Sequence, residues 1–353
     1  ERKCRLTYGR GLQMNQLSVK QRYERIIDMI NQNVTDYPKK RKTIRILTDF
    51  LLEKIRYKTK MSDYIQYEYY KKPNYLRREF IDENRREIIH RIMNDPKDCE
   101  LFNNKAEFNR VFTKYLGRDW FDTQNDPFEN FRLFVEKHKK FFVKPAEGWF
   151  GIGAGICNVE DDSSLDQVWR ELQEKKALLE ECITQHHELS EFNPTSVNTL
   201  RIVTVLCPDN NVKIMTADLR LGRKGKVADN FHHNGIASLI DVDTGIIYTM
   251  GIDKNRRRYI LHPDSKKQII GFCIPFWKQI KETVREAALI IPTVRYVGWD
   301  IALGENGEVM IVEGNCMADP DVTQMPDGKG KWPMYVPILK AVEKSRGGKS
   351  NPS

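Results

Sequence analysis

Apolar residues recur every three or four positions through the first hundred residues of this 353-residue chain. The pattern is clearest in YERIIDMINQ (23–32), IRILTDFLLEKI (44–55) and FIDENRREIIHRIM (80–93). This period is that of an amphipathic helix, and almost no glycine interrupts it. We therefore expect a helical N-terminal region over residues 1–100.

The pattern changes after residue 100. LFNNKAEFNRVFTKYL (101–116) predicts one more amphipathic helix, and KKFFVKP (139–145) predicts a short strand that ends at a proline. A glycine-rich stretch follows, then the helical pattern SSLDQVWRELQEKKALL (163–179) and a second strand, LLEECI (178–183). Strand, loop, helix and strand thus alternate over 139–183.

The remainder is mainly of β character. NTLRIVTVLCPDNNVKIMTADLRL (198–221) predicts two strands joined at PDNN, and VGWDIALGENGEVMIVEGN (297–315) predicts a hairpin. The helical pattern FWKQIKETVREAALII (276–291) precedes that hairpin, and the polar residues 341–353 predict a mobile tail.

Two carboxylates and an amide lie within the apolar alternation of the last hairpin. Asn306-Gly307 suits a two-residue type I′ turn, and counting back from it pairs Asp300 with Glu313. Asn315 lies two residues further along and shares their face. Because like charges directly opposite each other are destabilising, we expect a cation between the two carboxylates.

Carboxylate and amide oxygens are ligands that Mg²⁺ prefers, with phosphate and water completing its shell. The pattern therefore indicates a magnesium site. The alternative is an ordinary polar network in which Asp300 and Glu313 pair with a nearby cation, Arg295 for example.

A glycine-rich loop follows the strand 139–145. Gly148, Gly151, Gly153 and Gly155 would let backbone amides approach phosphate, and Lys144 precedes them. The stretch has neither the GK[ST] ending of a Walker A loop nor the GxGxxG of a dinucleotide fold. Glycine-rich loops are common, so this one is a candidate phosphate-binding loop mainly because Lys144 precedes it.

Further polar residues interrupt apolar strands. Glu180 and Glu181, with Glu188 beyond them, suit hydrogen bonds to adenine or ribose, or plain contact with solvent. Counting across PDNN, with Cys207 facing Val212, sets Arg201 opposite Asp218. Both a structural ion pair and a phosphate contact remain open for Arg201.

Lys and Arg exceed Asp and Glu by 58 − 49 = 9, which suits an anionic partner. Seven scattered cysteines without a CxxC pair favour neither a disulfide framework nor a zinc module, and they fit a reducing cytoplasm. No apolar run reaches the ~20 residues of a membrane span, and the first residues lack the apolar core of a signal peptide. We expect a cytoplasmic protein.

The order of these parts resembles the ATP-grasp superfamily. SVNTLRIVTV, VGWDIAL and VEGN are similar to its sugar-transfer-associated group, over roughly residues 100–335. The resemblance implies an α+β ATP-grasp fold in which two α+β lobes clamp ATP. The small lobe would span 101–183 and the large lobe 184–340, after the helical region 1–100.

The resemblance also implies roles for single residues. Lys105 and Lys144 would contact phosphates, although Asn104 stands where the family usually has Asp. Arg201 would steady the γ-phosphate and an acyl-phosphate, and with Lys144 it forms the catalytic pair. The other implied assignments are Gly151 and Gly153 in the lid, Glu180, Glu181 and Ile183 at adenine, Glu188 at ribose, and Asp300, Glu313 and Asn315 as metal ligands.

A substrate-side loop is implied by VADNFHHNGIAS (227–238). The candidate substrate contacts are Arg220, Asn230, His232, His233 and Asn234. Adjacent histidines are also common in surface loops, and the single Gly235 stands where two glycines are expected.

The function implied is ATP-dependent ligation of a carboxylate to an amine through an acyl-phosphate, with one or two Mg²⁺ ions, or Mn²⁺. Small-molecule substrates, sugar-linked ones of surface-polysaccharide biosynthesis included, are the expected partners, and neither their identity nor the oligomeric state follows from the sequence. A phosphotransferase on the same fold is the first alternative. A non-catalytic basic protein that binds nucleic acid or acidic glycan is the second, disfavoured because aromatic and basic residues are not interleaved.

Overall fold

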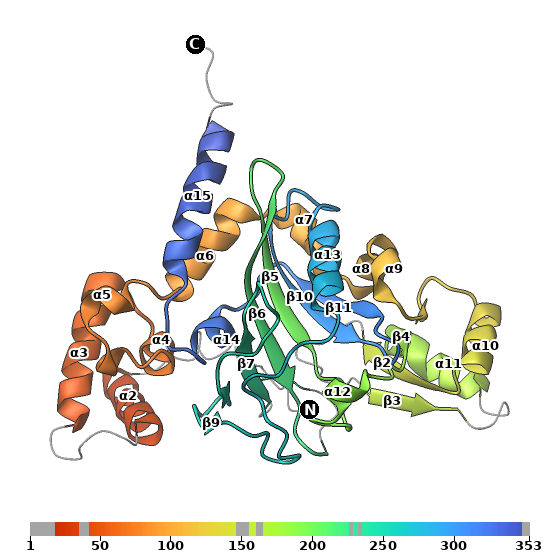
Figure 1. Cartoon of the computed structure of the whole chain (residues 1–353), viewed down its shortest axis with the longest axis horizontal. Helices are drawn as coiled ribbons and strands as arrows, with labels where there is room; N and C mark the ends of the chain where they lie inside the picture. Colours follow the sequence, from red (N-terminus) through yellow and green to blue (C-terminus); the bar gives the residue numbers. More distant parts are fainter. Residues whose placement is uncertain are drawn as a thin grey trace, which may run out of the picture. The chain divides into compact units, whose positions relative to one another are not determined.

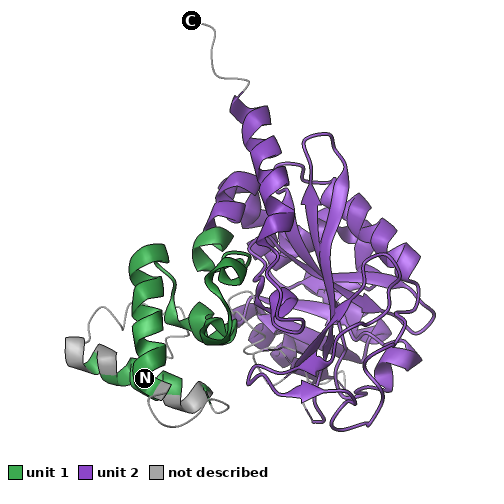
Figure 2. Ribbon diagram, turned by 60° about the vertical axis from the view of Figure 1, so that its left-hand side comes forward, with its two compact units in different colours: residues 1–86 green, residues 87–353 purple. Residues whose placement is uncertain are grey.

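The computed structural model describes residues 18–34, 42–145, 155–159, 165–225, 229, 231 and 235–347. The chain divides into two compact units, residues 1–86 and 87–353 (Figure 2). The division lies inside helix α6 (Glu83–Met93), earlier than the expected boundary at residue 100. The reason is that residues just beyond it are tied to the second unit: the Asn94 amide donates to the carbonyls of Tyr296 and Cys316.

The first unit is helical in its described residues, as the apolar spacing predicted. Its aromatic side chains form the core: Tyr64, Tyr69 and Phe80 are buried and pack edge to face. Tyr64 and Tyr69 thus serve packing between short helices. The helices are α2 (Val19–Asn33), α3 (Lys42–Tyr57), α4 (Met61–Gln66), the 3-10 turn η1 (Tyr69–Lys71), α5 (Asn74–Arg77) and the start of α6.

A four-stranded antiparallel sheet forms the first layer of the second unit. Its strands have the spatial order β1-β4-β2-β3, and β4, β2 and β3 are labelled in Figure 1. Phe131 of α10 and Leu172 of α11 pack against Phe141 of the sheet. The bounds are β1 (Trp120–Asp122), α10 (Phe128–Lys137), β2 (Lys140–Pro145), β3 (Gly155–Asn158), α11 (Leu165–Glu174) and β4 (Ala177–Glu181).

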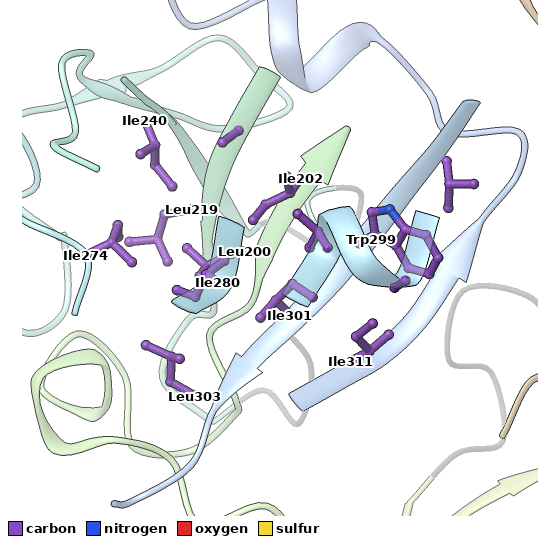
Figure 3. Close-up of a cluster of buried hydrophobic side chains, with 14 of the residues drawn as sticks. Leu200, Ile202, Leu219, Ile240, Ile274, Ile280, Trp299, Ile301, Leu303 and Ile311 are labelled. Carbon is purple, nitrogen blue, oxygen red and sulfur yellow. The ribbon is translucent and has the colours of Figure 1, made fainter. Parts of the chain in front are cut away.

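A seven-stranded antiparallel sheet forms the larger part, with the order β11-β10-β5-β6-β7-β8-β9. Ile280 of α13 packs against core residues such as Ile202, Leu219 and Trp299 on one face of this sheet (Figure 3). The bounds are β5 (Leu200–Leu206), β6 (Val212–Leu221), β7 (Ile236–Ile240), β8 (Gly251–Ile252), β9 (Arg258–Tyr259), α13 (Trp277–Ala288), β10 (Tyr296–Leu303) and β11 (Val309–Asn315).

Shorter helices connect these layers. The stretch expected as one helix over 101–116 is divided among three. The Asn104 side chain accepts from the amides of Ala106 and Glu107 and so begins the second of them. Helix α15 continues to Gly347, through residues expected in the tail. The remaining bounds are α7 (Pro96–Asn103), α8 (Lys105–Val111), α9 (Thr113–Leu116), α12 (His187–Ser190), α14 (Asp321–Gln324) and α15 (Trp332–Gly347). No helix in the described part of the chain is long and apolar enough to cross a membrane.

The β10–β11 hairpin has a longer turn than predicted. The Gly304 amide bonds the Glu308 carbonyl at 2.9 Å, which leaves three residues in the turn, and Gly307 takes a positive φ of 92°. The register then shifts once between Asp300 and Ile301, leaving Val312 as an extra residue in β11. Because this bulge offsets the longer turn, Asp300 does lie opposite Glu313 as predicted.

The β5–β6 hairpin shows the same pair of departures. Cys207 bonds Asn211 rather than facing Val212, and Asn210 takes a positive φ of 61°. A register shift between Val203 and Thr204 then restores the predicted pairing of Arg201 with Asp218.

Candidate active site

Four charged residues stand directly opposite one another across adjacent strands of the large sheet. They are Asp218 on β6, Arg201 on β5, Asp300 on β10 and Glu313 on β11. Side chains alternate between the faces of a sheet, and neighbours such as Trp299 belong to the core beneath α13 (Figure 3). The row of four therefore lies on the opposite face.

Arg201 and Asp300 form a bidentate ion pair within this row. The Arg201 Nε and Nη2 atoms donate to the two carboxylate oxygens at 2.5 and 2.9 Å. Arg220 lies 3.4 Å from Asp300 and 3.6 Å from Asp218. Burial alone would raise the pKa of Asp300, but the charges of Arg201 and Arg220 outweigh it and lower that pKa.

The protein itself thus supplies part of the positive charge that we expected between Asp300 and Glu313. It is not Arg295, whose Nη1 donates to the carbonyls of Leu206 and Cys207. Arg201 and Arg220 take that place on Asp300, while among the described residues no ion pair joins either of them to Glu313. The polar-network alternative therefore accounts for Asp300 and leaves Glu313 unexplained.

Glu313 and Asn315 lie on the open side of the row. The Asn315 Nδ2 donates to Glu313 Oε1 at 3.0 Å. Surrounding protein atoms, and then the Asp300 carboxylate, raise the pKa of Glu313 although its side chain is open to solvent. The Asp300 and Glu313 carboxylates and the amide oxygen of Asn315 are the kind of ligands that a hard divalent cation prefers.

Asp218 is fully buried at the other end of the row. Neither of its carboxylate oxygens has a hydrogen-bond partner among the described residues. Burial raises its pKa to about 7, against the lowering effects of Arg220 and Arg201. Asp218 was predicted only as the residue opposite Arg201, and the structure adds it to the site as a buried acid that titrates near neutrality.

Lys105 and Lys144 bring positive charge close to this face. Lys144 Nζ lies 2.7 Å from Glu180 Oε2, and Lys105 Nζ donates to the Pro145 carbonyl at 2.8 Å. Burial, and then the charge of Lys144, lowers the pKa of Lys105, while Glu313 interacts electrostatically with both lysines. The two predicted phosphate lysines thus converge near the predicted metal ligands.

Glu180, which was predicted to contact adenine, is the centre of a buried charge cluster. It accepts from Lys144, from Asn109 at 3.3 Å and from Arg118 at 2.9 Å. Burial would raise its pKa, but Lys144 and Arg118 lower it to about 2. Sequence reasoning missed Arg118 and Asn109, since isolated polar residues in GRDW and EFNRV carry no pattern.

The other residues predicted to contact adenine and ribose are spread out. The Glu181 carboxylate accepts from the Asp119 amide at 3.0 Å, and Ile183 follows β4. Glu188 lies in α12, where its carbonyl accepts from Lys267 at 2.7 Å. The remaining predicted site residues lie outside the described residues: Gly151, Gly153, Asn230, His232, His233 and Asn234.

A family model described as sugar-transfer associated ATP-grasp matches residues 84–344. This chain belongs to that ATP-grasp family. The family match begins close to the division between the two compact units at residues 86 and 87, so most of the first unit precedes the ATP-grasp part. The α+β ATP-grasp fold expected from the sequence is confirmed.

Solved ATP-grasp structures are similar to this chain. The ATP-grasp ligase PsnB complexed with minimal precursor is 13% identical, with a TM-score of 0.44 over 70% of this chain and 64% of that chain. A Chryseobacterium gregarium RiPP-associated ATP-grasp ligase in complex with ADP and a leader and core peptide is 14% identical, with a TM-score of 0.42 over 72% and 63%.

A more distant structure is the ADP complex of PurK, N5-carboxyaminoimidazole ribonucleotide synthetase, which is 10% identical, with a TM-score of 0.37 over 63% of this chain and 46% of that chain. This ATP-grasp chain spans less than two thirds of each of these three proteins. No curated protein is significantly similar to it in sequence.

Proposed function

We propose that this chain is an ATP-dependent carboxylate–amine ligase that forms an amide and releases ADP and phosphate. The observation that carries the proposal is the charged row from Asp218 to Glu313, with Lys105 and Lys144 close to its open end. Membership of the ATP-grasp family supports it.

The cations and the oxygen donors have separate tasks. Lys105 and Lys144 supply positive charge for the phosphates of ATP. Asp300, Glu313 and Asn315 would hold Mg²⁺, which when bound neutralises phosphate charge and makes the γ-phosphorus more electrophilic. Arg201 remains fixed on Asp300, so its guanidinium is already positioned when negative charge develops nearby.

The reaction has two group-transfer steps. One oxygen of the substrate carboxylate attacks the γ-phosphorus of ATP, and ADP leaves with the electron pair of the broken bond. The amine nitrogen then attacks the acyl carbon, loses a proton, and expels phosphate that keeps the attacking carboxylate oxygen. Most of the catalysis is positioning and charge neutralisation.

Arg220 is the residue that best fits the incoming carboxylate. It lies between the carboxyl groups of Asp218 and Asp300, and its side chain is 15% exposed. An anionic substrate group would add a further partner for its planar guanidinium. The family's association with sugar transfer supports a carboxylate or amine carried on a sugar or polysaccharide precursor.

Isotope transfer tests the proposal. Protein, ATP and Mg²⁺ are incubated with panels of ¹⁸O-labelled carboxylates and of amines, sugar-linked ones included, and ADP, free phosphate and amide are measured. A ligase of this kind forms the three products in equal amounts, and each phosphate carries one ¹⁸O from the carboxylate. The Glu313→Ala variant serves as the inactive control.

Other outcomes separate the alternatives. ADP formed without free phosphate, together with a phosphorylated hydroxyl product, would show a phosphotransferase. Salt-sensitive binding to nucleic acid or acidic glycan, with no ADP from any substrate pair, would favour the non-catalytic binding protein.

A further inference from the structure

Arg118 makes an unusual set of contacts for a residue outside the charged row. Its side chain is 1% exposed. Its Nε donates to Glu180 at 2.9 Å, while Nη1 donates to the Ile311 carbonyl at 2.8 Å and Nη2 to the Val312 carbonyl at 3.3 Å. One guanidinium thus joins a strand of the small sheet to a strand of the large one.

The two carbonyls belong to consecutive residues of β11. In a regular strand, successive carbonyls point to opposite sides, so one guanidinium cannot donate to both of them. Val312 is the extra residue of the bulge, and its insertion turns one peptide unit so that both carbonyls reach Arg118. The Arg118 guanidinium therefore fits the bulged form of β11 and not a regular one.

The bulge decides which face Glu313 occupies. If the register set by Gly304 and Glu308 at the turn continued along both strands, Val312 rather than Glu313 would lie opposite Asp300. A one-residue change of register moves a side chain to the other face of the sheet. Only the bulged strand brings Glu313 beside Asp300.

We propose that Arg118 is a positioning residue that stabilises the Val312 bulge and so holds Glu313 and Asn315 on the metal-binding face. Through Glu180, the same guanidinium connects this register to Lys144. The inference rests on the proposed function, because the bulge positions metal ligands only if that face binds Mg²⁺ with ATP.

Calorimetric titration with ATP tests this role without relying on turnover. Wild type, Arg118→Met and Arg118→Lys are titrated in excess EDTA and at a series of magnesium concentrations. Arg295→Met is the matched control, since Arg295 also donates to two consecutive carbonyls, those of Leu206 and Cys207, away from the charged row.

We expect the magnesium concentration for half-maximal enhancement of ATP affinity to rise at least about tenfold in Arg118→Met, the usual effect of losing an outer-sphere positioning group. Affinity in EDTA should fall less than affinity with magnesium. Arg118→Lys should show the same direction, because an ammonium can pair with Glu180 but cannot span two carbonyls. Arg295→Met should lower the melting temperature without moving the magnesium midpoint.

A wild-type midpoint in Arg118→Met would overturn the inference and leave the proposed function standing. If that variant does not fold, Arg118→Lys decides in the same way, since a wild-type midpoint there means that charge at Glu180 suffices. Absence of magnesium-dependent ATP binding in the wild type itself would instead remove the proposed function.

Discussion

Asp300 lies directly opposite Glu313, and the register between β10 and β11 shifts by one residue on the turn side of this pair. Asp300 is held by two arginines, while Glu313 is open to solvent, accepts a hydrogen bond from Asn315 and lies against the Asp300 carboxylate. The pair is therefore one carboxylate compensated by ion pairs beside one that forms no ion pair among the described residues. That asymmetry is the basis of the metal assignment.

Gly298 should tolerate no side chain, because it leaves room for Arg201. A Cβ at this position would lie 2.6 Å from the Ala318 Cβ and 3.1 Å from the Arg201 Cδ. We expect Gly298→Ala to displace Arg201 and weaken magnesium-dependent ATP binding, as measured by calorimetry. Gly347→Ala, where a Cβ meets nothing within 4 Å, should bind as wild type. Equal binding by both variants would show that the Arg201 position is not critical.

Trp299 should contribute strongly to stability. It is fully buried, packs against Phe112 and donates from Nε1 to Thr204 Oγ1 at 2.8 Å. Trp299→Ala should lower the free energy of unfolding by about 3–5 kcal/mol in urea denaturation. Leu133→Ala, at a side chain that is 62% exposed, is the control and should change it little. A small effect at Trp299 would mean that the α13 face repacks.

Glu180 should stabilise the fold at neutral pH. Its folded pKa is lowered to about 2 from the ordinary 4.5, so the stabilisation is complete above pH 4.5 and is lost as the pH falls through 2. Glu180→Gln leaves Arg118 and Lys144 without their counter-charge and should cost about 3–5 kcal/mol at pH 7.

The same variant should approach wild-type stability as the pH falls below 4.5, which denaturation at several pH values would detect. Glu286→Gln, which removes the partner of the exposed Lys114, should match the wild type at every pH. A Glu180→Gln penalty that does not depend on pH would indicate a packing effect instead.

Asp63 should have the opposite pH dependence. Burial raises its pKa from 3.8 to about 7, so the folded state favours the protonated acid. Stability should therefore fall as the pH rises from about 4 to about 7, and the loss is complete above that range. Asp63→Asn keeps an acceptor for the Glu83 amide and should stabilise the protein at pH 8 but not at pH 4. Parallel unfolding curves at both pH values would contradict this.

Three of the four charged residues in the row, Arg201, Asp300 and Glu313, were candidates from the sequence because they interrupt apolar alternation. The pairing of Asp300 with Glu313 came from counting back from a two-residue turn, whereas the real turn has three residues. The error cancelled because a bulge compensates for the longer turn, and the β5–β6 hairpin repeats this. The alternation of apolar and polar residues predicts which face of the sheet each side chain occupies. It does not reveal the turn length and the bulge that together set the register.

Other features have no signal in a single sequence. Arg118 is one arginine among many, and only tertiary contacts place it on Glu180 and on the β11 carbonyls. The three helices over 96–116 were merged because their apolar spacing runs on across Asn104, whose capping role depends on local backbone geometry.

The proposed metal site is tested most directly by calorimetric titration of ATP with Mg²⁺ into the wild type, Glu313→Ala and Glu308→Ala. Glu308 is the matched control, a carboxylate at the turn end of the same hairpin that bonds Asn306. We expect wild type and Glu308→Ala to bind ATP in a magnesium-dependent manner, and Glu313→Ala to lose this binding while circular dichroism shows an intact fold. Unchanged binding by Glu313→Ala, or no magnesium-dependent binding by the wild type, would contradict it.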